Sequence, residues 1–222
     1  MKRAILLSGG QDSMALAYWL KPEWAITIDY GQAAASSEIC AARGYAAWAG
    51  IGHEVITVDC RALGCGEMAG ASVHALSPTL EWWPFRNQLL VTLASMKLVQ
   101  CGIDEVIIGS VKGDAIHADG TSGFVQNMDA LLRIQEGAIR FSAPALHLTS
   151  TELLRKSRIP LGVLALAHSC HSGPIPCGQC RGCIKSLEVF AFVEENQHLW
   201  GEEEAKEHVQ EVQGADGRGL DL

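Results

Sequence analysis

The sequence lacks any long apolar stretch. No segment approaches the roughly twenty apolar residues that a membrane-spanning helix requires, and the apolar run near the N-terminus covers only residues 4–7. That run is shorter than the about 7–15 apolar residues in the core of a signal peptide, and no cleavage site follows it. We therefore expect a cytoplasmic protein that does not associate with membranes.

An excess of positive charge is also missing. The chain has 17 Lys and Arg residues against 25 Asp and Glu residues, which gives a formal net charge of -8. A general nucleic-acid binder should present a basic face, so the composition excludes that class but allows a small anionic ligand in a local pocket. A Gly-x-x-x-x-Gly-Lys-Ser/Thr motif is absent too, which argues against a Walker-type kinase or GTPase.

What the sequence does contain is an alternation of short apolar runs with longer helical stretches. The 222 residues suffice for one substantial domain. The apolar runs predict buried strands over residues 4–7, 25–28, 54–58, 105–108 and 138–141. Helical spacing predicts helices over residues 12–20, 34–49, 85–101, 124–135, 149–158 and 184–195. This alternation predicts an α/β fold with a doubly wound, mostly parallel five-stranded sheet.

Three segments depart from the strand and helix pattern. Residues 60–82 are rich in glycine and follow no period, so we expect a long insertion near the ligand-binding edge of the sheet. Residues 166–200 form a cysteine-containing C-terminal segment, which we expect to pack on an α/β domain of residues 1–165. Residues 201–222 are acidic and then glycine-rich, and we expect a disordered tail there.

Four of the eight cysteines form a Cys-x6-Cys-x2-Cys-x2-Cys pattern on a Gly- and Pro-rich segment, and they are Cys170, Cys177, Cys180 and Cys183. Closely spaced thiolates are ligands that a tetrahedral zinc ion takes. A reducing cytoplasm disfavours two disulfides. The same spacing also fits an iron–sulfur cluster or a set of unrelated buried thiols. His168 and His171 flank the first cysteine, but four thiols suffice without them.

The second informative motif is Leu7-Ser8-Gly9-Gly10-Gln11-Asp12-Ser13, which follows the first predicted strand and opens the first predicted helix. Adjacent glycines lack Cβ atoms, so backbone N–H groups can turn toward a phosphate. The helix N-terminus adds a favourable partial charge, and Ser8 and Ser13 can donate hydroxyl hydrogens. Asp12 suits an N-terminal cap or a ligand for Mg²⁺ that bridges phosphates. The alternative interpretation of this motif is an ordinary glycine-rich turn without a ligand.

The full Ser-Gly-Gly-x-Asp-Ser pattern resembles the pyrophosphate loop of the PP-loop ATPases, or N-type ATP pyrophosphatases, which have an adenine nucleotide alpha hydrolase-like fold. Three further segments narrow the resemblance, and they are Asp29-Tyr30-Gly31-Gln32, Pro84-Phe85-Arg86-Asn87 and Ser142-Ala143-Pro144 with the following His147-Leu148-Thr149. Together with the cysteine pattern they resemble the 7-cyano-7-deazaguanine synthases of queuosine biosynthesis. This resemblance runs from residue 6 to about residue 190.

The resemblance implies an ATP-dependent carbon–nitrogen ligase. Such an enzyme adenylates the carboxylate of 7-carboxy-7-deazaguanine, and ammonia then gives an amide that a second ATP converts to 7-cyano-7-deazaguanine. The implied partners are ATP with Mg²⁺, the 7-deazaguanine carboxylate, ammonia and a second copy of the chain in a homodimer. One zinc ion per chain would be structural, because four protein ligands leave no position for substrate.

The resemblance also implies site residues. Those expected to bind nucleotide are Leu7, Ser8, Gly9, Gly10, Gln11, Asp12, Ser13, Asp29, Asn87 and Gly109. Asp12, Arg86 and Lys112 are the candidate catalytic residues. Arg86 neutralises a phosphate or a carboxylate, or it is a surface arginine. Asn87 binds ligand or caps its helix, and Asp29 faces ligand or ends its strand.

The sequence departs from the family pattern where substrate and acceptor should lie. Residues 33–35 are alanines in place of a basic pair, residues 109–121 replace a Tyr- and Asp-rich stretch, and Ser150 replaces a lysine for which Lys112 is our candidate substitute. Two further hypotheses therefore stay open. One is an antiviral-defence paralogue that joins the activated carboxylate to another amine, on a partner protein. The second is a non-catalytic nucleotide-binding zinc protein, against which the complete Ser-Gly-Gly loop argues.

Overall fold

One parallel sheet organises the chain. The computed structural model describes residues 1–200, so the acidic tail predicted for residues 201–222 lies outside the described residues. The strands are β1 (Arg3–Leu6), β2 (Trp24–Asp29), β3 (Gly52–Thr57), β4 (Glu105–Ile108) and β5 (Arg140–Ser142). They lie in the order β3-β2-β1-β4-β5, and each neighbouring pair is parallel. The predicted five-stranded sheet is confirmed, and it is wholly parallel rather than mostly so.

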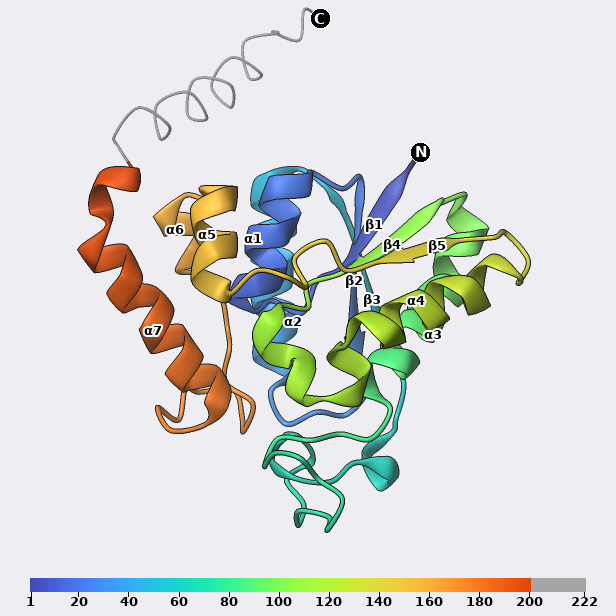
Figure 1. Ribbon diagram of the computed structural model, residues 1–222, viewed down its shortest axis with the longest axis horizontal. Coiled ribbons are helices and arrows are strands. Elements are labelled where there is room, and N and C mark those ends of the chain that lie inside the picture. The colour runs from blue at the N-terminus through green and yellow to red at the C-terminus, as the bar shows by residue number, and fades with distance from the viewer. Residues whose placement is uncertain (201–222) are drawn as a thin grey trace, which may run out of the picture.

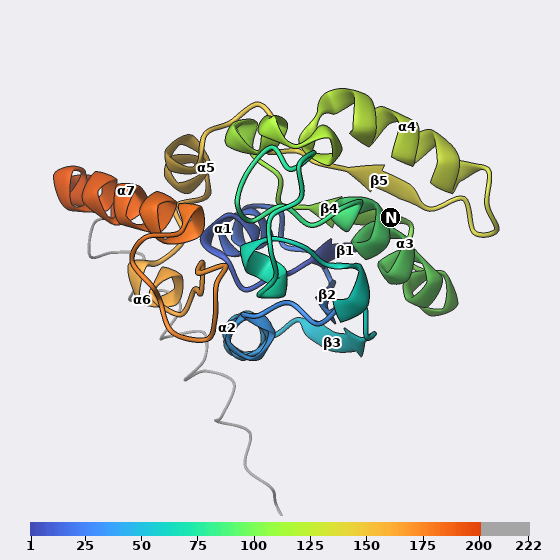
Figure 2. The same cartoon turned by 90° about the horizontal axis from the view of Figure 1, so that it is seen from below.

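Helices cover both faces of this sheet, as the prediction of a doubly wound fold requires (Figures 1 and 2). One face carries α1 (Gln11–Leu20), α2 (Ala35–Ala49), α5 (Ser150–Ser157), α6 (Leu161–Leu164) and α7 (Arg181–Glu195). The other face carries α3 (Arg86–Leu98) and α4 (Ser122–Arg133). Successive strand side chains point to opposite faces, so Ile5 joins the first core and Leu6 the second.

Two element boundaries differ from the prediction for local reasons. Strand β5 begins at Arg140 rather than at residue 138, because Gly137 and Ala138 have φ angles of 88° and 46° and form a turn. Helix α7 begins at Arg181 rather than at residue 184, because the Sγ atom of Cys180 accepts a hydrogen bond from the backbone N–H of Cys183 and caps the helix.

The insertion predicted between β3 and α3 is confirmed. It contains two short 3₁₀ turns, Arg61–Leu63 and Glu67–Ala69, and otherwise no helix or strand. It lies at the end of the sheet where the strands finish (Figure 1, bottom). Met68, Glu81 and Trp83 of this segment are nevertheless buried, and the Trp83 ring meets Tyr30 edge-on at 4.8 Å. The insertion therefore packs over the carboxyl edge of the sheet.

The C-terminal segment packs closely on the first core. Val189 and Val193 of α7 join that core, and the backbone N–H of His168 donates to the carbonyl of Gly9 at 2.9 Å. The domain division at residue 165 stays a prediction. Within residues 1–200, the structure contains no helix with both the length and the apolar character needed to cross a membrane.

Candidate functional site

A cavity opens at the carboxyl edge of the sheet, beside the point where the strand order reverses between β1 and β4. Parallel α/β sheets bind ligands at such switch points. The predicted residues that line it are Leu7, Ser8, Gly10, Gln11, Asp12, Ser13, Arg86, Asn87 and Gly109. Thus the Ser-Gly-Gly loop, the start of α3 and the end of β4, which are far apart in the sequence, border one cavity.

The Ser-Gly-Gly loop is held together by its own hydroxyl groups. The Oγ atom of Ser8 donates to that of Ser13 at 3.1 Å, and Ser13 Oγ donates to the carbonyl of Gly10 at 2.9 Å. Gly9 has φ of 77° and lies against α2, where a Cβ atom would collide with the carbonyl oxygen of Glu38. Within residues 1–200 no side chain caps α1, so its first N–H groups are available to an anionic ligand.

Gly109 brings the end of β4 close to this loop. A Cβ atom on Gly109 would lie 3.0 Å from the Cα atom of Ser13, which is tighter than ordinary packing. The glycine therefore lets the β4 end and the N-terminus of α1 line the same cavity.

Arg86 and Asn87 enter the cavity from the start of α3. The backbone N–H of Asn87 donates to the Asp119 carboxylate at 2.9 Å, and its side-chain amide donates to the Asp119 carbonyl at 2.9 Å. Asp119 thus serves as the cap, and Asn87 does not cap the helix. The Arg86 guanidinium contacts the Asn87 amide oxygen at 3.4 Å and Met68 Sδ at 3.2 Å. Within the described residues it makes no ion pair, so its charge is available to an anion.

Three predicted residues do not line the cavity. Gly9 shapes the turn behind it. The Asp29 carboxylate accepts a hydrogen bond from the backbone N–H of Gly31 at 3.1 Å, which is the contact expected of a residue that ends a strand. The Lys112 side chain is exposed, although its backbone N–H donates to the carbonyl of Leu148 at 2.8 Å.

A lysine that sequence reasoning missed does reach the cavity. Lys185 of α7 places its Nζ atom 2.5 Å from Asp12 Oδ2 and 3.8 Å from Asp114 Oδ1. Burial favours its neutral form, but the two carboxylates outweigh burial and raise the pKa of Lys185 above its ordinary value. Lys185 stands two residues after the last cysteine of the pattern, and that adjacency is the signal by which the sequence could have pointed to it.

Glu38 is a second cavity residue that sequence reasoning missed. Its Oε2 atom accepts a hydrogen bond from Gln32 Nε2 at 2.7 Å. The same amide is fixed by the backbone, because Gln32 Oε1 accepts from the N–H of Tyr30 at 3.0 Å and Nε2 donates to the carbonyl of Ile28 at 3.2 Å. Burial raises the pKa of Glu38 to about 7, although the hydrogen bond from Gln32 and the charge of Arg86 act to lower it.

We expect a Glu38→Gln variant to gain stability relative to the natural protein as pH rises. The pKa of Glu38 in the folded protein, about 7, lies above its ordinary value of 4.5. The contribution of protonated Glu38 to stability is therefore complete below pH 4.5 and is lost as pH rises through 7. Glutamine stays neutral and avoids this loss. The free energy of unfolding of each protein is measured in urea at about pH 5 and pH 8. The advantage of the variant over the natural protein should grow by on the order of 1–2 kcal/mol between these pH values, allowing for a partly exposed side chain. An equal difference at both pH values would contradict the assigned pKa.

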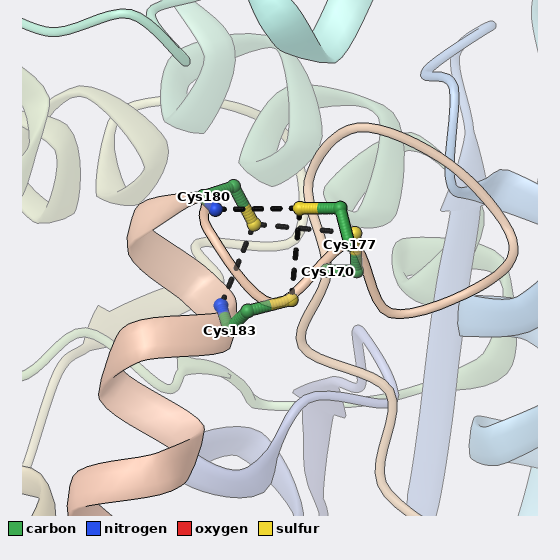
Figure 3. Close-up of side chains that lie close together, drawn as sticks. All are labelled: Cys170, Cys177, Cys180 and Cys183. Carbon is green, nitrogen blue, oxygen red and sulfur yellow. Dashed lines mark hydrogen bonds between the residues drawn. The ribbon is translucent and has the colours of Figure 1, made fainter.

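The four predicted cysteines lie close together (Figure 3). Their neighbours Ser169, His171 and Gly182 line the cavity. The Sγ atoms of the four cysteines all lie within 4.8 Å of one another. The pairs Cys177–Cys183 and Cys170–Cys180 are each 3.9 Å apart, and bonds of about 2.3 Å to one tetrahedral ion would place the sulfurs about 3.8 Å apart. An iron–sulfur cluster would spread its thiolates further, because iron and sulfide atoms lie between them. The four thiols could therefore hold a single metal ion.

Backbone N–H groups support these thiols. The N–H of Cys180 donates to Cys177 Sγ at 3.3 Å, and those of Cys183 and His171 donate to Cys180 Sγ at 3.4 Å each (Figure 3 shows the first two). Among the described residues the ligand group contains the four cysteines and neither histidine. His168 and His171 line the cavity instead.

A partly buried ion-pair cluster ties the cysteine segment to the insertion. Arg181, between the third and fourth cysteines, donates from Nη1 to Glu81 Oε1 at 3.1 Å and from Nη2 to the Gly113 carbonyl at 2.6 Å. His117 Nε2 lies 3.7 Å from the same Glu81 oxygen. Burial would raise the pKa of Glu81, but hydrogen bonds from His117, its own backbone and Arg181 hold it well below its ordinary value.

Comparison with known proteins identifies relatives over most of the chain. The family model described as "Queuosine biosynthesis protein QueC" matches residues 2–194. The 7-cyano-7-deazaguanine synthase of Gloeobacter violaceus is 32% identical over 212 residues, covering 83% of this chain and 89% of that protein. The synthase of Laribacter hongkongensis is 29% identical, covering 84% and 89%. Among solved structures, the U34-tRNA thiolase NcsA from Methanococcus maripaludis with its [4Fe-4S] cluster aligns at a TM-score of 0.49 and 17% identity, covering 99% of this chain and 74% of that one.

Proposed function

The chain belongs to the QueC family of queuosine biosynthesis proteins, and from this premise we propose that it uses ATP to convert 7-carboxy-7-deazaguanine and ammonia to 7-cyano-7-deazaguanine. The observation that carries the proposal is the cavity itself. It combines the N-terminus of α1 behind a Ser-Gly-Gly loop with the guanidinium of Arg86, which makes no ion pair within residues 1–200. Such a cavity suits a ligand with several phosphates and a carboxylate.

The proposed chemistry solves a leaving-group problem. A carboxylate oxygen attacks the α-phosphorus of ATP, the bond to the β-phosphate oxygen breaks, and pyrophosphate leaves. Ammonia then attacks the acyl carbon, loses a proton and expels AMP, which gives the amide. The amide oxygen attacks a second ATP in the same way. The nitrogen then loses its protons as the carbon–oxygen bond breaks, which releases AMP and leaves the nitrile.

The residues of the cavity have roles of positioning and charge neutralisation in this proposal. The loop from Ser8 to Ser13 holds the β- and γ-phosphates through its N–H and hydroxyl groups. Arg86 neutralises the charge that builds up between the carboxylate and the α-phosphate. Asp12 is the residue that would hold Mg²⁺, which neutralises phosphate charge when it accompanies ATP. Asn87, fixed by Asp119, keeps Arg86 oriented toward the cavity.

We assign a structural zinc ion to the four-cysteine site. Four thiolates complete a tetrahedral sphere, so the ion would have no open position for substrate or water. Its role is to fix the turn from which α7 begins. The spacing of the sulfurs supports this assignment.

One incubation separates the proposed reaction from the competing hypotheses. The protein is mixed with ATP, Mg²⁺ and 7-carboxy-7-deazaguanine, with and without ammonium, and pyrophosphate, AMP, ADP and the base products are measured by mass. Nitrile that requires ammonium supports the proposal. Pyrophosphate with an adenylate but no nitrile favours transfer to a different amine acceptor, as in a defence paralogue. Absence of ATP consumption with this carboxylate contradicts both and leaves a nucleotide-binding protein.

A further inference from the structure

We propose that Lys185 is the second phosphate-binding cation of the cavity and that the four-cysteine segment places it there. The inference rests on the proposed use of ATP and adds to it a residue from outside the Ser-Gly-Gly loop. It also gives the cysteine segment a direct part in substrate binding, through a side chain of the helix that it begins.

Lys185 lies where a phosphate would need a cation. Among the described residues, the Lys and Arg side chains that line the cavity are Arg86 and Lys185. Arg86 comes from α3 on one face of the sheet, and Lys185 comes from α7 on the other. A triphosphate on the loop between them would therefore have cations on two sides.

The carboxylates beside the loop favour a cation at this position. Asp12 adds a carboxylate to a segment that should receive phosphates, and Asp114 adds another nearby. Lys185 Nζ lies 2.5 Å from Asp12 and 3.8 Å from Asp114, so it offsets the repulsion that these carboxylates would exert on an anionic ligand. An ammonium group carries three donors, so it can contact a phosphate oxygen while it remains beside Asp12.

The cysteine segment fixes the position of Lys185. Arg181 and Lys185 are four residues apart on α7 and so lie on the same face of the helix. Arg181 binds Glu81 and the Gly113 carbonyl, while Lys185 binds Asp12 and, next to Gly113, Asp114. This face of α7 is therefore held to the cavity wall at two successive turns, directly after the Cys180 cap.

Binding of Mg²⁺-pyrophosphate and of Mg²⁺-ATP, measured by calorimetry on the metal-replete protein, tests the inference. A Lys185→Met variant should bind both about 10- to 100-fold more weakly, as expected for the loss of a charge-assisted contact, and Lys185→Arg should recover part of the affinity. Lys97→Met is the matched control, because Lys97 pairs with Glu54 on the surface. Arg181→Met should lose about three- to tenfold through positioning alone.

Chemical footprinting of the natural protein covers the case in which Lys185→Met does not fold. Pyrophosphate should slow acetylation of Lys185 and leave Lys97 unchanged. Equal pyrophosphate affinity in Lys185→Met and the natural protein, no protection of Lys185, or no pyrophosphate binding by the natural protein would each overturn the inference. These measurements need no deazaguanine, so a failure of the proposed reaction with intact, lysine-dependent ATP binding is a distinct result.

Discussion

Replacing Arg86 with methionine is expected to lower the rate of pyrophosphate release by about 100- to 1,000-fold, the usual cost of removing one preorganised group that stabilises developing charge. The physical reason is that this guanidinium makes no ion pair within residues 1–200 and is held toward the cavity by Asn87 and Met68. Its charge is therefore available to a ligand. The effect is measured as the initial rate of pyrophosphate release with saturating ATP and 7-carboxy-7-deazaguanine.

The controls separate a lost charge from a disturbed fold. Arg86→Lys keeps the charge without the planar fork and should retain more activity than Arg86→Met. Arg133→Met removes an exposed arginine that pairs with Asp129 within α4 and should have the rate of the natural protein. An Arg86→Met variant with the natural rate and melting temperature would rule out the assigned role.

The second large effect is expected at the metal. Cys177→Ala should lower bound zinc from about one ion per chain to a small fraction, because loss of a direct ligand should exceed the 10- to 100-fold cost of losing an outer-shell partner. Cys177 is exposed, so its replacement removes little packing. Any large fall in melting temperature would therefore result from the loss of bound zinc, because metal-binding energy contributes to folding. Elemental analysis and thermal unfolding measure the two effects.

Cys40 provides the comparison for that experiment. It is also exposed, and it lies on α2 and outside the four-cysteine group. Cys40→Ala should keep both the zinc content and the melting temperature of the natural protein. Zinc content that is unchanged in Cys177→Ala, or equally reduced in Cys40→Ala, would refute the four-thiolate assignment.

The centre of the sheet was predictable because β1, β2 and β4 are short apolar runs whose residues are mostly buried. Residues such as Ile5 and Ile107 mark β1 and β4 without reference to the rest of the chain. The strand order was not predicted, since it depends on where each crossover returns. Helix α6 was missed because Leu161–Leu164 is too short to show a helical period, and the start of α7 depends on a thiol cap that periodicity cannot reveal.

The residues of the site fall into two groups: those in continuous sequence motifs, which were predicted, and those that only the fold brings to the cavity, which were not. The Ser-Gly-Gly loop and the four cysteines are continuous patterns, and the sequence alone was enough to select them. Lys185 and Glu38 belong to no such pattern, because each becomes a cavity residue only when α7 and α2 pack against the loop. Lys112 shows the converse, since its place in the sequence suggested a site cation that the fold leaves exposed.

Oxygen-isotope transfer tests the central proposal most directly. The protein is incubated with ATP, Mg²⁺, ammonium and 7-carboxy-7-deazaguanine in which both carboxylate oxygens are ¹⁸O. The masses of the products are then measured by mass spectrometry. If the carboxylate and then the amide are adenylated, each AMP released carries one ¹⁸O, and the 7-cyano-7-deazaguanine carries none. AMP without the label, label in inorganic phosphate together with ADP, or recovery of all the label in unreacted carboxylate would contradict the proposal.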